Sequence, residues 1–122
     1  MIIYNLFPPL ADKISDWSPH LERAASMNFD WVFVNPIHLP GRSGSIYSVK
    51  DYFQFNPLLL DPESKTSPVQ EFQSVVKEAE KLGLRMMIDL VVNHCATDSP
   101  LLEENPEWFI RKNGRLDRKS VV

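Results

Sequence analysis

The stretch that most constrains the fold is residues 86–94, which read Met-Met-Ile-Asp-Leu-Val-Val-Asn-His. Apolar runs of this kind are typical of strands that are buried on both faces of a parallel sheet. This run carries one carboxylate, Asp89, near its middle. An ionised carboxylate in a buried strand is costly unless it is paired or hydrogen-bonded. We therefore expect a polar site beside this strand.

Alternating strand and helix signals predict βαβ units and hence a parallel sheet. Each helix is expected to start at a serine that is followed by proline, and the second start also has the glutamine of a capping box. A residue that tolerates left-handed backbone is expected to end each helix. The expected order is a strand over 2–7, a helix from the N-cap Ser18 to Asn28, a strand over 31–34, a helix from Ser67 (with Gln70) to Gly83, and a strand from 84.

Two parts of the chain fall outside this alternation. Residues 36–66 predict a long irregular loop, and such loops in compact domains are usually functional or disordered. After His94 the pattern stops, and only a short helix near residues 101–109 is expected. We therefore divide the chain into the first βα units, residues 1–94, and the start of a long loop after the third strand, residues 95–122.

The two faces of the expected third strand differ in polarity. Alternate residues of a strand point to opposite faces. The odd-numbered residues from Asp89 to Asn93 would look toward a polar interior, and the even-numbered, apolar residues from Met86 to Val92 toward helices. Ligands of parallel α/β folds bind at the carboxyl ends of the strands. Asp89, Asn93, His94 and the loop after Pro36 are thus the expected site.

Each of these polar residues also has a structural alternative. His94 is a candidate ligand contact, proton shuttle or metal ligand, but a single histidine at a strand end is more often structural. Asp89 would equally serve as the partner of an arginine on a neighbouring strand, and Asn93 as the cap of a turn. His94 and Cys95 alone do not supply the four spaced ligands that zinc requires.

Composition excludes several classes of function. The net charge of −3 argues against nucleic-acid binding as the main role, and the basic residues 111, 112, 115, 118 and 119 lie among acidic ones, which predicts a solvated tail. The single cysteine cannot form an internal disulfide. Residues 1–9 lack the pattern of a leader, and no apolar run is long enough to span a membrane. We expect a cytoplasmic chain.

Four segments, in the right order, resemble the α-amylase family, glycoside hydrolase family 13. Residues 89–94 resemble the D-x-V-x-N-H segment that closes the third barrel strand of that family. Residues 47–52, Tyr-Ser-Val-Lys-Asp-Tyr, resemble its Tyr-x-x-x-Asp-Tyr segment in the loop after the second strand. Residues 31–36 are similar to its second strand, which ends in proline. Residues 105–109 resemble the Pro-x-Trp-Phe segment found after the third strand of several members.

The resemblance implies the N-terminal portion, about three strands, of a (β/α)8 barrel that cleaves or transfers α-glucosidic bonds with retention. It implies that His94 hydrogen-bonds the sugar and that Tyr47 stacks beneath it. Asp89 would brace an arginine on the next strand, and Asp51 would also support the site. Asn93 would be a ligand of calcium in those members that bind it. The implied partner is an α-glucan or malto-oligosaccharide, with no nucleic acid and no membrane.

The sequence departs from the family in two ways. Ile46 stands where members often have glycine before the stacking tyrosine. The family's catalytic carboxylates lie on the fourth, fifth and seventh strands, so no catalytic residue is assigned among these 122 residues, about half of a barrel. A retaining glycosidase needs two such groups, and we expect the chain alone to be inactive.

Two other hypotheses stay open. One is a non-catalytic module that binds sugar or associates with itself through open sheet edges. The other is a parallel α/β enzyme of unrelated chemistry. No glycine-rich phosphate loop follows the first strand, which counts against a nucleotide-binding fold.

Overall fold

The computed structural model describes residues 1–117 and 121 of the 122-residue chain. They divide into two compact units. The first unit comprises Met1–Ile37 and Pro57–Asp89, and the second comprises His38–Asn56 and Leu90–Val122. Among the described residues, no helix combines the length and apolar character that a membrane crossing requires.

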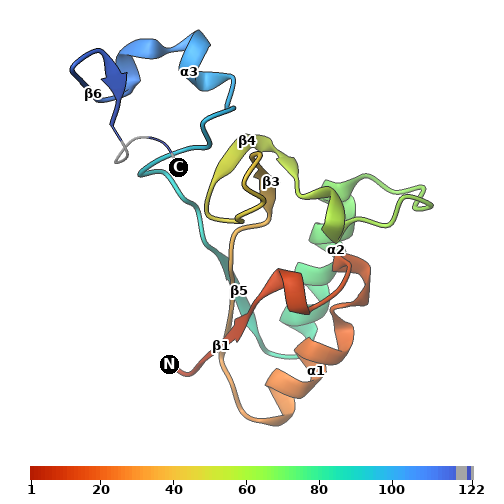
Figure 1. Ribbon diagram of the computed structural model, residues 1–122. Helices are drawn as coiled ribbons and strands as arrows, with labels where there is room; N and C mark the ends of the chain where they lie inside the picture. The colour runs from red at the N-terminus through yellow and green to blue at the C-terminus, as the bar shows by residue number, and fades with distance from the viewer. Residues whose placement is uncertain (118–120, 122) are drawn as a thin grey trace. The chain divides into compact units, whose positions relative to one another are not determined.

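The first unit contains a parallel sheet of three strands in the order β1-β2-β5 (Figure 1). Strand β1 is Ile3–Leu6, β2 is Trp31–Val34 and β5 is Arg85–Ile88. In this register Tyr4, Val32 and Met86 lie side by side across the sheet. The parallel α/β architecture expected from the alternating pattern is thus confirmed.

Two helices cover one face of this sheet (Figure 1). Helix α1 is Ser18–Ser26 and α2 is Pro68–Lys81, and each buries small or aliphatic side chains. On the sheet, Val32 and Val34 of β2 and Leu6 of β1, which pairs with Val34, are buried on the same face, where Tyr4 is half-buried. Each Å² of apolar surface that is removed from water between the helices and the sheet contributes about 25 cal/mol to stability. The unit also holds the 3₁₀ turns η1 (Pro8–Leu10), η2 (Ile14–Asp16) and η3 (Pro57–Leu59).

The predicted helix ends are confirmed except at one serine. The Ser67 hydroxyl accepts a hydrogen bond from the Gln70 amide, and the Gln70 side-chain oxygen accepts one from the Ser67 amide, which completes the capping box. Asn28 (φ 62°) and Gly83 (φ 78°) have the left-handed backbone expected after each helix. Ser18 is not an N-cap: it is already helical, and its hydroxyl instead donates to Glu78 at 2.7 Å.

The third strand, β5, is shorter than its sequence predicts, because the chain after the neighbouring strand β2 lacks the next main-chain hydrogen-bond donor. The Asp89 amide still donates to the Val34 carbonyl at 2.8 Å. The evenly spaced ladder of a parallel pair would next use the amide of residue 36, and Pro36 has none. Strand β5 therefore ends at Ile88, and Asp89 follows the strand instead of lying within it. The predicted two-faced strand over residues 89–93 is wrong.

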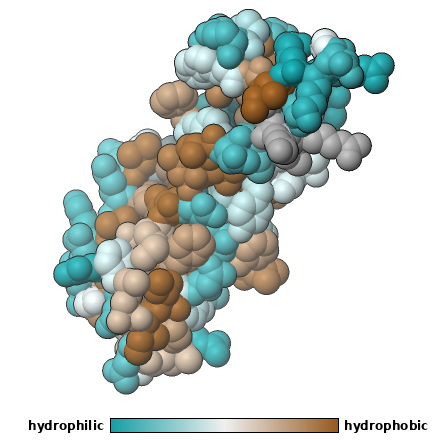
Figure 2. Space-filling view, turned by 90° about the vertical axis from the view of Figure 1, so that its left-hand side faces the viewer, coloured by the Kyte–Doolittle hydropathy of each residue, from teal (hydrophilic) through white to brown (hydrophobic). Residues whose placement is uncertain are grey.

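The exposure of the even-numbered residues confirms this correction. Leu90 is 54% exposed and Val92 is 77% exposed, so they do not pack toward helices as expected. Strands β1 and β5 are the outer strands of the sheet, and each leaves one edge unpaired within the described residues. Hydrophobic side chains are accordingly visible at the surface among hydrophilic ones in Figure 2.

The second unit contains an antiparallel pair where an irregular loop was expected. Strand β3 is His38–Pro40 and β4 is Val49–Phe55, and the pairing is interrupted by shifts of register. The expected short helix is present as α3, Leu101–Glu104, followed by the 3₁₀ turn η4, Pro106–Trp108.

The basic stretch near the C-terminus forms a hairpin instead of a simple tail. Strands β6 (Arg111–Lys112) and β7 (Arg115–Leu116) pair across Asn113-Gly114, where both residues have positive φ. This dipeptide is the preferred turn of a two-residue hairpin. The basic side chains at 111, 112 and 115 are exposed, as expected for solvated residues, and Arg118 and Lys119 lie outside the described residues.

We expect Ser67→Ala to lower the free energy of unfolding by about 1 kcal/mol, because the Gln70 amide at the start of α2 loses its partner. Urea unfolding followed by circular dichroism measures this change. Ser15→Ala is the matched control, since the exposed Ser15 hydroxyl makes no hydrogen bond within the described residues. Equal midpoints for the two variants would contradict a stabilising role of the capping box.

Candidate functional site

Two of the predicted site residues meet in the second unit. The imidazole Nε2 of His94 lies 2.9 Å from the main-chain oxygen of Tyr47. A carbonyl oxygen only accepts hydrogen bonds, so Nε2 carries the hydrogen, and in the neutral ring Nδ1 is the acceptor. The Tyr47 residue is 41% exposed, so part of its surface is accessible to a ligand.

A second tyrosine, Tyr52, holds the main chain on either side of this site. Its hydroxyl lies 2.6 Å from the carbonyl oxygen of Val91 and 3.1 Å from that of His94, and it donates to both. Its ring packs at an angle against His38, with centroids 5.9 Å apart. Burial, together with the nearby Cys95, raises the pKa of the Tyr52 phenol, so the hydroxyl stays protonated and remains a donor.

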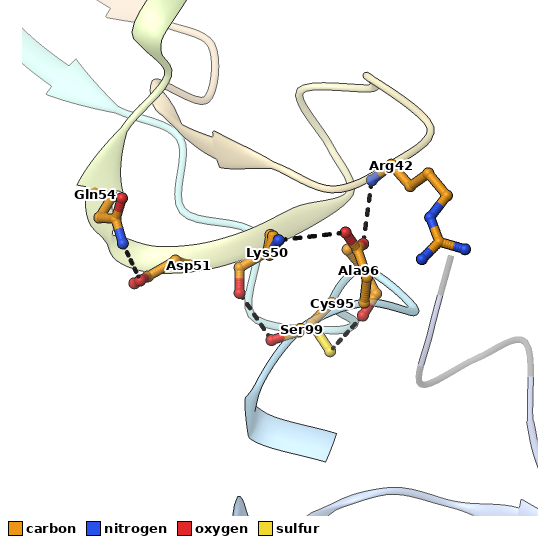
Figure 3. A network of polar contacts seen from close by, with 8 residues as sticks. Arg42, Lys50, Asp51, Gln54, Cys95, Ala96 and Ser99 are labelled. Atoms are coloured by element: carbon orange, nitrogen blue, oxygen red, sulfur yellow. Dashed lines mark hydrogen bonds and ion pairs between the residues drawn. The ribbon is translucent and has the colours of Figure 1, made fainter. Parts of the chain in front are cut away.

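The chain after His94 is tied to the same strand by further polar contacts (Figure 3). The Ala96 amide donates to the Val49 carbonyl at 2.7 Å, and the Ser99 hydroxyl donates to the Lys50 carbonyl at 2.8 Å. We call residues 91–99 the anchored segment. Its acceptors and donors are mostly main-chain atoms, so its position depends on the path of the backbone around β4.

An acidic side chain completes this anchoring. The Asp98 carboxylate accepts a hydrogen bond from the Arg42 amide at 3.1 Å and lies 3.6 Å from the Lys50 ammonium. The side chains of Ala96 and Asp98 leave no room for a larger residue at position 41, since a Cβ added at Gly41 would overlap the Cβ of Ala96 and approach the Asp98 carboxylate. Gly41 is therefore required by close packing.

A hollow of about 490 Å³ lies beside the anchored segment in the second unit. Aromatic and aliphatic side chains form most of its wall, and Asn93 and His94 supply polar groups. None of the lining residues is Lys, Arg, Asp or Glu, so the wall carries no fixed charge. The lining residues are Tyr52, Phe53, Leu90, Val92, Asn93, His94, Cys95, Leu101, Trp108 and Phe109.

The two predicted supporting residues, Asp51 and Asp89, lie in different units. Asp51 accepts hydrogen bonds from the Phe53 amide and from the Gln54 side chain, both at 2.8 Å, so it stabilises the turn of its own strand (Figure 3). Asp89 is half-buried at the end of the first unit. The structure thus brings Tyr47 and His94 together and places Asp89 in the other unit.

The surroundings of Asn93 bear on the calcium expectation. Calcium takes six to eight oxygen ligands, several of them carboxylates as a rule. Asn93 is exposed, and the described residues contain no cluster of three or more His, Cys, Asp or Glu side chains that could hold a metal ion. The described residues therefore do not form a calcium site by themselves, and we assign no chemical step to calcium.

The residue that departs from the family pattern has a structural reason. Ile46 is only 8% exposed and belongs to the core of the second unit with Val49. The neighbouring cysteine is buried as well, and burial raises the pKa of the Cys95 thiol. Ile46 therefore packs the interior, and Cys95 is largely buried although it forms part of the wall of the hollow.

Sequence reasoning missed the roles of Tyr52, Lys50, Ser99 and Asp98. The side chains of Tyr52, Ser99 and Asp98 contact main-chain atoms that lie far away in the sequence, and Lys50 pairs with the distant Asp98 carboxylate. No local pattern marks such contacts. Tyr52 gave a partial signal, since it lies within the segment of residues 47–52 that also contains Tyr47.

Comparison with known proteins identifies the family of this chain. Residues 3–112 match the family described as glycogen debranching enzyme, glucanotransferase domain. The chain belongs to this family, and with it to the α-amylase family of glycoside hydrolases.

Individual relatives agree with this assignment. The chain is 36% identical over 94 residues to the glycogen debranching enzyme of Saccharomyces cerevisiae, covering 76% of this chain and 6% of that protein. It is 30% identical over 105 residues to an alpha-1,4-glucan:maltose-1-phosphate maltosyltransferase of Arcanobacterium haemolyticum, covering 73% and 15%. The structure of an alpha-amylase from Lactobacillus plantarum aligns with a TM-score of 0.78 at 30% identity, covering 95% and 28%.

These relatives are much longer than the present chain. The 122 residues span between 6% and 28% of the three proteins just named. The expected membership of the α-amylase family is confirmed. The activity of a whole relative belongs to a longer polypeptide.

We expect the Asp98 carboxyl to titrate below its ordinary value of 3.8, because the Arg42 amide and then the Lys50 charge lower its pKa in the fold. A lowered pKa stabilises the folded state above the pKa of the unfolded chain, and this contribution disappears as the pH falls through the folded value. Carboxyl carbon shifts measured by NMR from pH 6 to pH 2 give the midpoint.

Two variants test the assignment. Asp98→Asn should remove the acid-induced loosening of residues 95–99 measured by hydrogen exchange, whereas Asp16→Asn, an exposed carboxylate in the first unit, should leave it unchanged. A midpoint for Asp98 at or above 3.8 would show that the two contacts do not stabilise the ionised form.

Proposed function

We propose that residues 1–122 supply the first three strands and a sugar-contacting loop of a (β/α)8 barrel, whose parent enzyme hydrolyses or transfers α-glucosidic bonds with retention. The observation that carries this proposal is the hydrogen bond between the His94 imidazole and the Tyr47 carbonyl. It joins an exposed aromatic residue and a ring with a defined acceptor, which are the two kinds of group that hold a sugar.

The chemistry of the two side chains supports sugar binding. The apolar face of a glucosyl ring packs well on an aromatic ring, and Tyr47 offers one. Nδ1 of His94 accepts a hydrogen bond from a sugar hydroxyl while Nε2 stays engaged with Tyr47. Such contacts orient the sugar and favour the distorted shape of the transition state in glycoside cleavage. Asp89, and Asp51 through its turn, support these groups in our proposal.

The uncharged hollow supports a neutral glucan as the ligand. A sugar phosphate carries about two negative charges, which proteins usually match with arginine or lysine. The hollow beside His94 is lined by aromatic, aliphatic and neutral polar groups only. We therefore infer that this chain contacts an unphosphorylated α-glucan or malto-oligosaccharide, and that calcium, where the parent enzyme uses it, requires ligands in addition to Asn93.

A second candidate function is a non-catalytic module that binds sugar or associates with itself. The observation in its favour is the pair of outer strands, β1 and β5. Each has an edge that no other described residue pairs with, and each carries an exposed isoleucine, Ile3 or Ile88. Unprotected edges of this kind pair readily with another strand. Native mass measurement separates the candidates, since a stable dimer favours the module and a monomer favours the barrel segment.

We expect maltotriose to shift the NMR signals of Tyr47 and His94 in the 122-residue chain. His94→Ala and Tyr47→Ala should each weaken maltotriose binding about tenfold, because each removes one hydrogen bond or one stacking contact. His20→Ala, a substitution on α1 in the first unit, is the matched control and should leave the binding unchanged.

Maltose-1-phosphate provides the test of charge. Because the hollow has no fixed positive charge, it should bind no more tightly than maltose. Tighter binding of the phosphate, or maltotriose shifts confined to the first unit, would contradict the proposed ligand and its place.

We expect no release of reducing sugar when the 122-residue chain is incubated with malto-oligosaccharides. Retaining glycosidases need two carboxyl groups about 5 Å apart, and we assign no such pair here. A reducing-end assay with an active α-amylase as positive control measures this. Turnover that disappears in His94→Ala but persists after repeated purification would overturn the proposal that the chain is inactive alone.

A further inference from the structure

We propose that Tyr52 is a positioning residue for His94, which holds the imidazole so that Nδ1 faces the ligand. This inference rests on the proposed role of His94 in sugar binding. It goes beyond that role because it assigns to a second tyrosine, whose hydroxyl is engaged with main-chain oxygens, the task of setting which ring nitrogen is presented.

The first step of the argument is the geometry at the Tyr52 hydroxyl. One hydrogen is shared between the carbonyl oxygens of Val91 and His94, at 2.6 and 3.1 Å. Two carbonyls three residues apart can reach one donor only if the chain between them bends. The hydroxyl therefore stabilises a bend over residues 91–94 in place of the extended chain that the β-branched Val91 and Val92 favour.

The second step is the geometry at the ring. The bend carries His94, and the Nε2 hydrogen of its ring reaches the Tyr47 carbonyl at 2.9 Å. Tyr47 and Tyr52 lie in one short segment, so this segment holds His94 both by its main chain and by its ring. If the bend relaxes by a few tenths of an ångström, the ring bond lengthens, and the imidazole is free to present either nitrogen.

The third step separates positioning from general stability. The rest of the anchored segment has its own contacts with β4 through Ala96 and Ser99. Removal of the Tyr52 hydroxyl leaves these contacts, the ring packing against His38 and the whole first unit in place. The consequences should therefore be confined to residues 91–94.

The test compares Tyr52→Phe with Tyr4→Phe in the 122-residue chain. Both variants lose one phenolic oxygen, but the Tyr4 hydroxyl makes no hydrogen bond within the described residues, and its ring packs on Phe29. In the unmodified chain, the Nε2 hydrogen of His94 should be visible by NMR, since a solvated imidazole hydrogen exchanges too fast to be seen. In Tyr52→Phe this signal should disappear, or its exchange should accelerate about tenfold.

Amide exchange supplies the discriminating readout. The amide of Asp89, which donates to Val34 in the first unit, should exchange at the same rate in both variants. The amide of Ala96 should accelerate less than the His94 ring hydrogen does. An equal acceleration at all these sites would show a merely structural role, and an unchanged ring signal in Tyr52→Phe, or its absence in the unmodified chain, would also overturn the proposal.

Sugar binding forms a separate arm of the experiment. With maltotriose as the probe, Tyr52→Phe should weaken binding about tenfold while Tyr4→Phe does not. If the unmodified chain does not bind maltotriose, the proposed function fails, yet the ring signal still decides whether Tyr52 positions His94. If binding is normal in Tyr52→Phe although the ring signal is lost, the positioning role in binding is refuted.

Discussion

The missing amide hydrogen of Pro36 is the constraint on which the arrangement of this chain depends. A parallel ladder uses every second residue of each strand as a donor. The last such bond on this side of β2 is the one that the Asp89 amide gives to Val34, and Pro36 has no hydrogen with which to continue. The pairing therefore stops at the carboxyl ends of β2 and β5, and the main-chain groups of residues 90–94 need other hydrogen-bond partners.

The partners that they find determine what the segment can do. Buried main-chain carbonyls need donors, and here the Tyr52 hydroxyl supplies one to Val91 and His94. A side chain that satisfies the backbone also fixes its path, because the hydroxyl has only one hydrogen and a rigid ring behind it. The end of a strand is thereby converted into a bend that carries a histidine. This explains why the site follows β5 instead of lying on it.

The parts of the fold that could be predicted from sequence are those decided by neighbouring residues. The capping box of Ser67 and Gln70 and the left-handed Asn28 depend on contacts within a few residues, and all are as expected. The parallel strands follow from alternating patterns. The end of β5 is a different case, because Pro36 acts on a strand about 50 residues later, and only knowledge of the pairing shows which donor is missing.

The remaining differences have the same origin. The shifts of register between β3 and β4 leave no regular alternation for a reader of the sequence, whereas the Asn113-Gly114 turn is a local signal that was available. For the site, the residue types Tyr47 and His94 indicated a role together, but their actual link uses a main-chain oxygen. A main-chain oxygen is the same for every residue type, so sequence carries no trace of it.

This reliance on main-chain atoms has a consequence for how such a site tolerates change. The Tyr47 carbonyl remains whatever residue occupies position 47, so the ring of His94 keeps its partner even when the aromatic surface is altered. The Tyr52 hydroxyl has no such substitute, since no other residue places a donor at the same distance along a rigid ring. Loss of the stacking ring should therefore affect ligand affinity alone, while loss of the second tyrosine should affect the geometry of the histidine. The two tyrosines, five residues apart, thus have separable physical roles in one short segment.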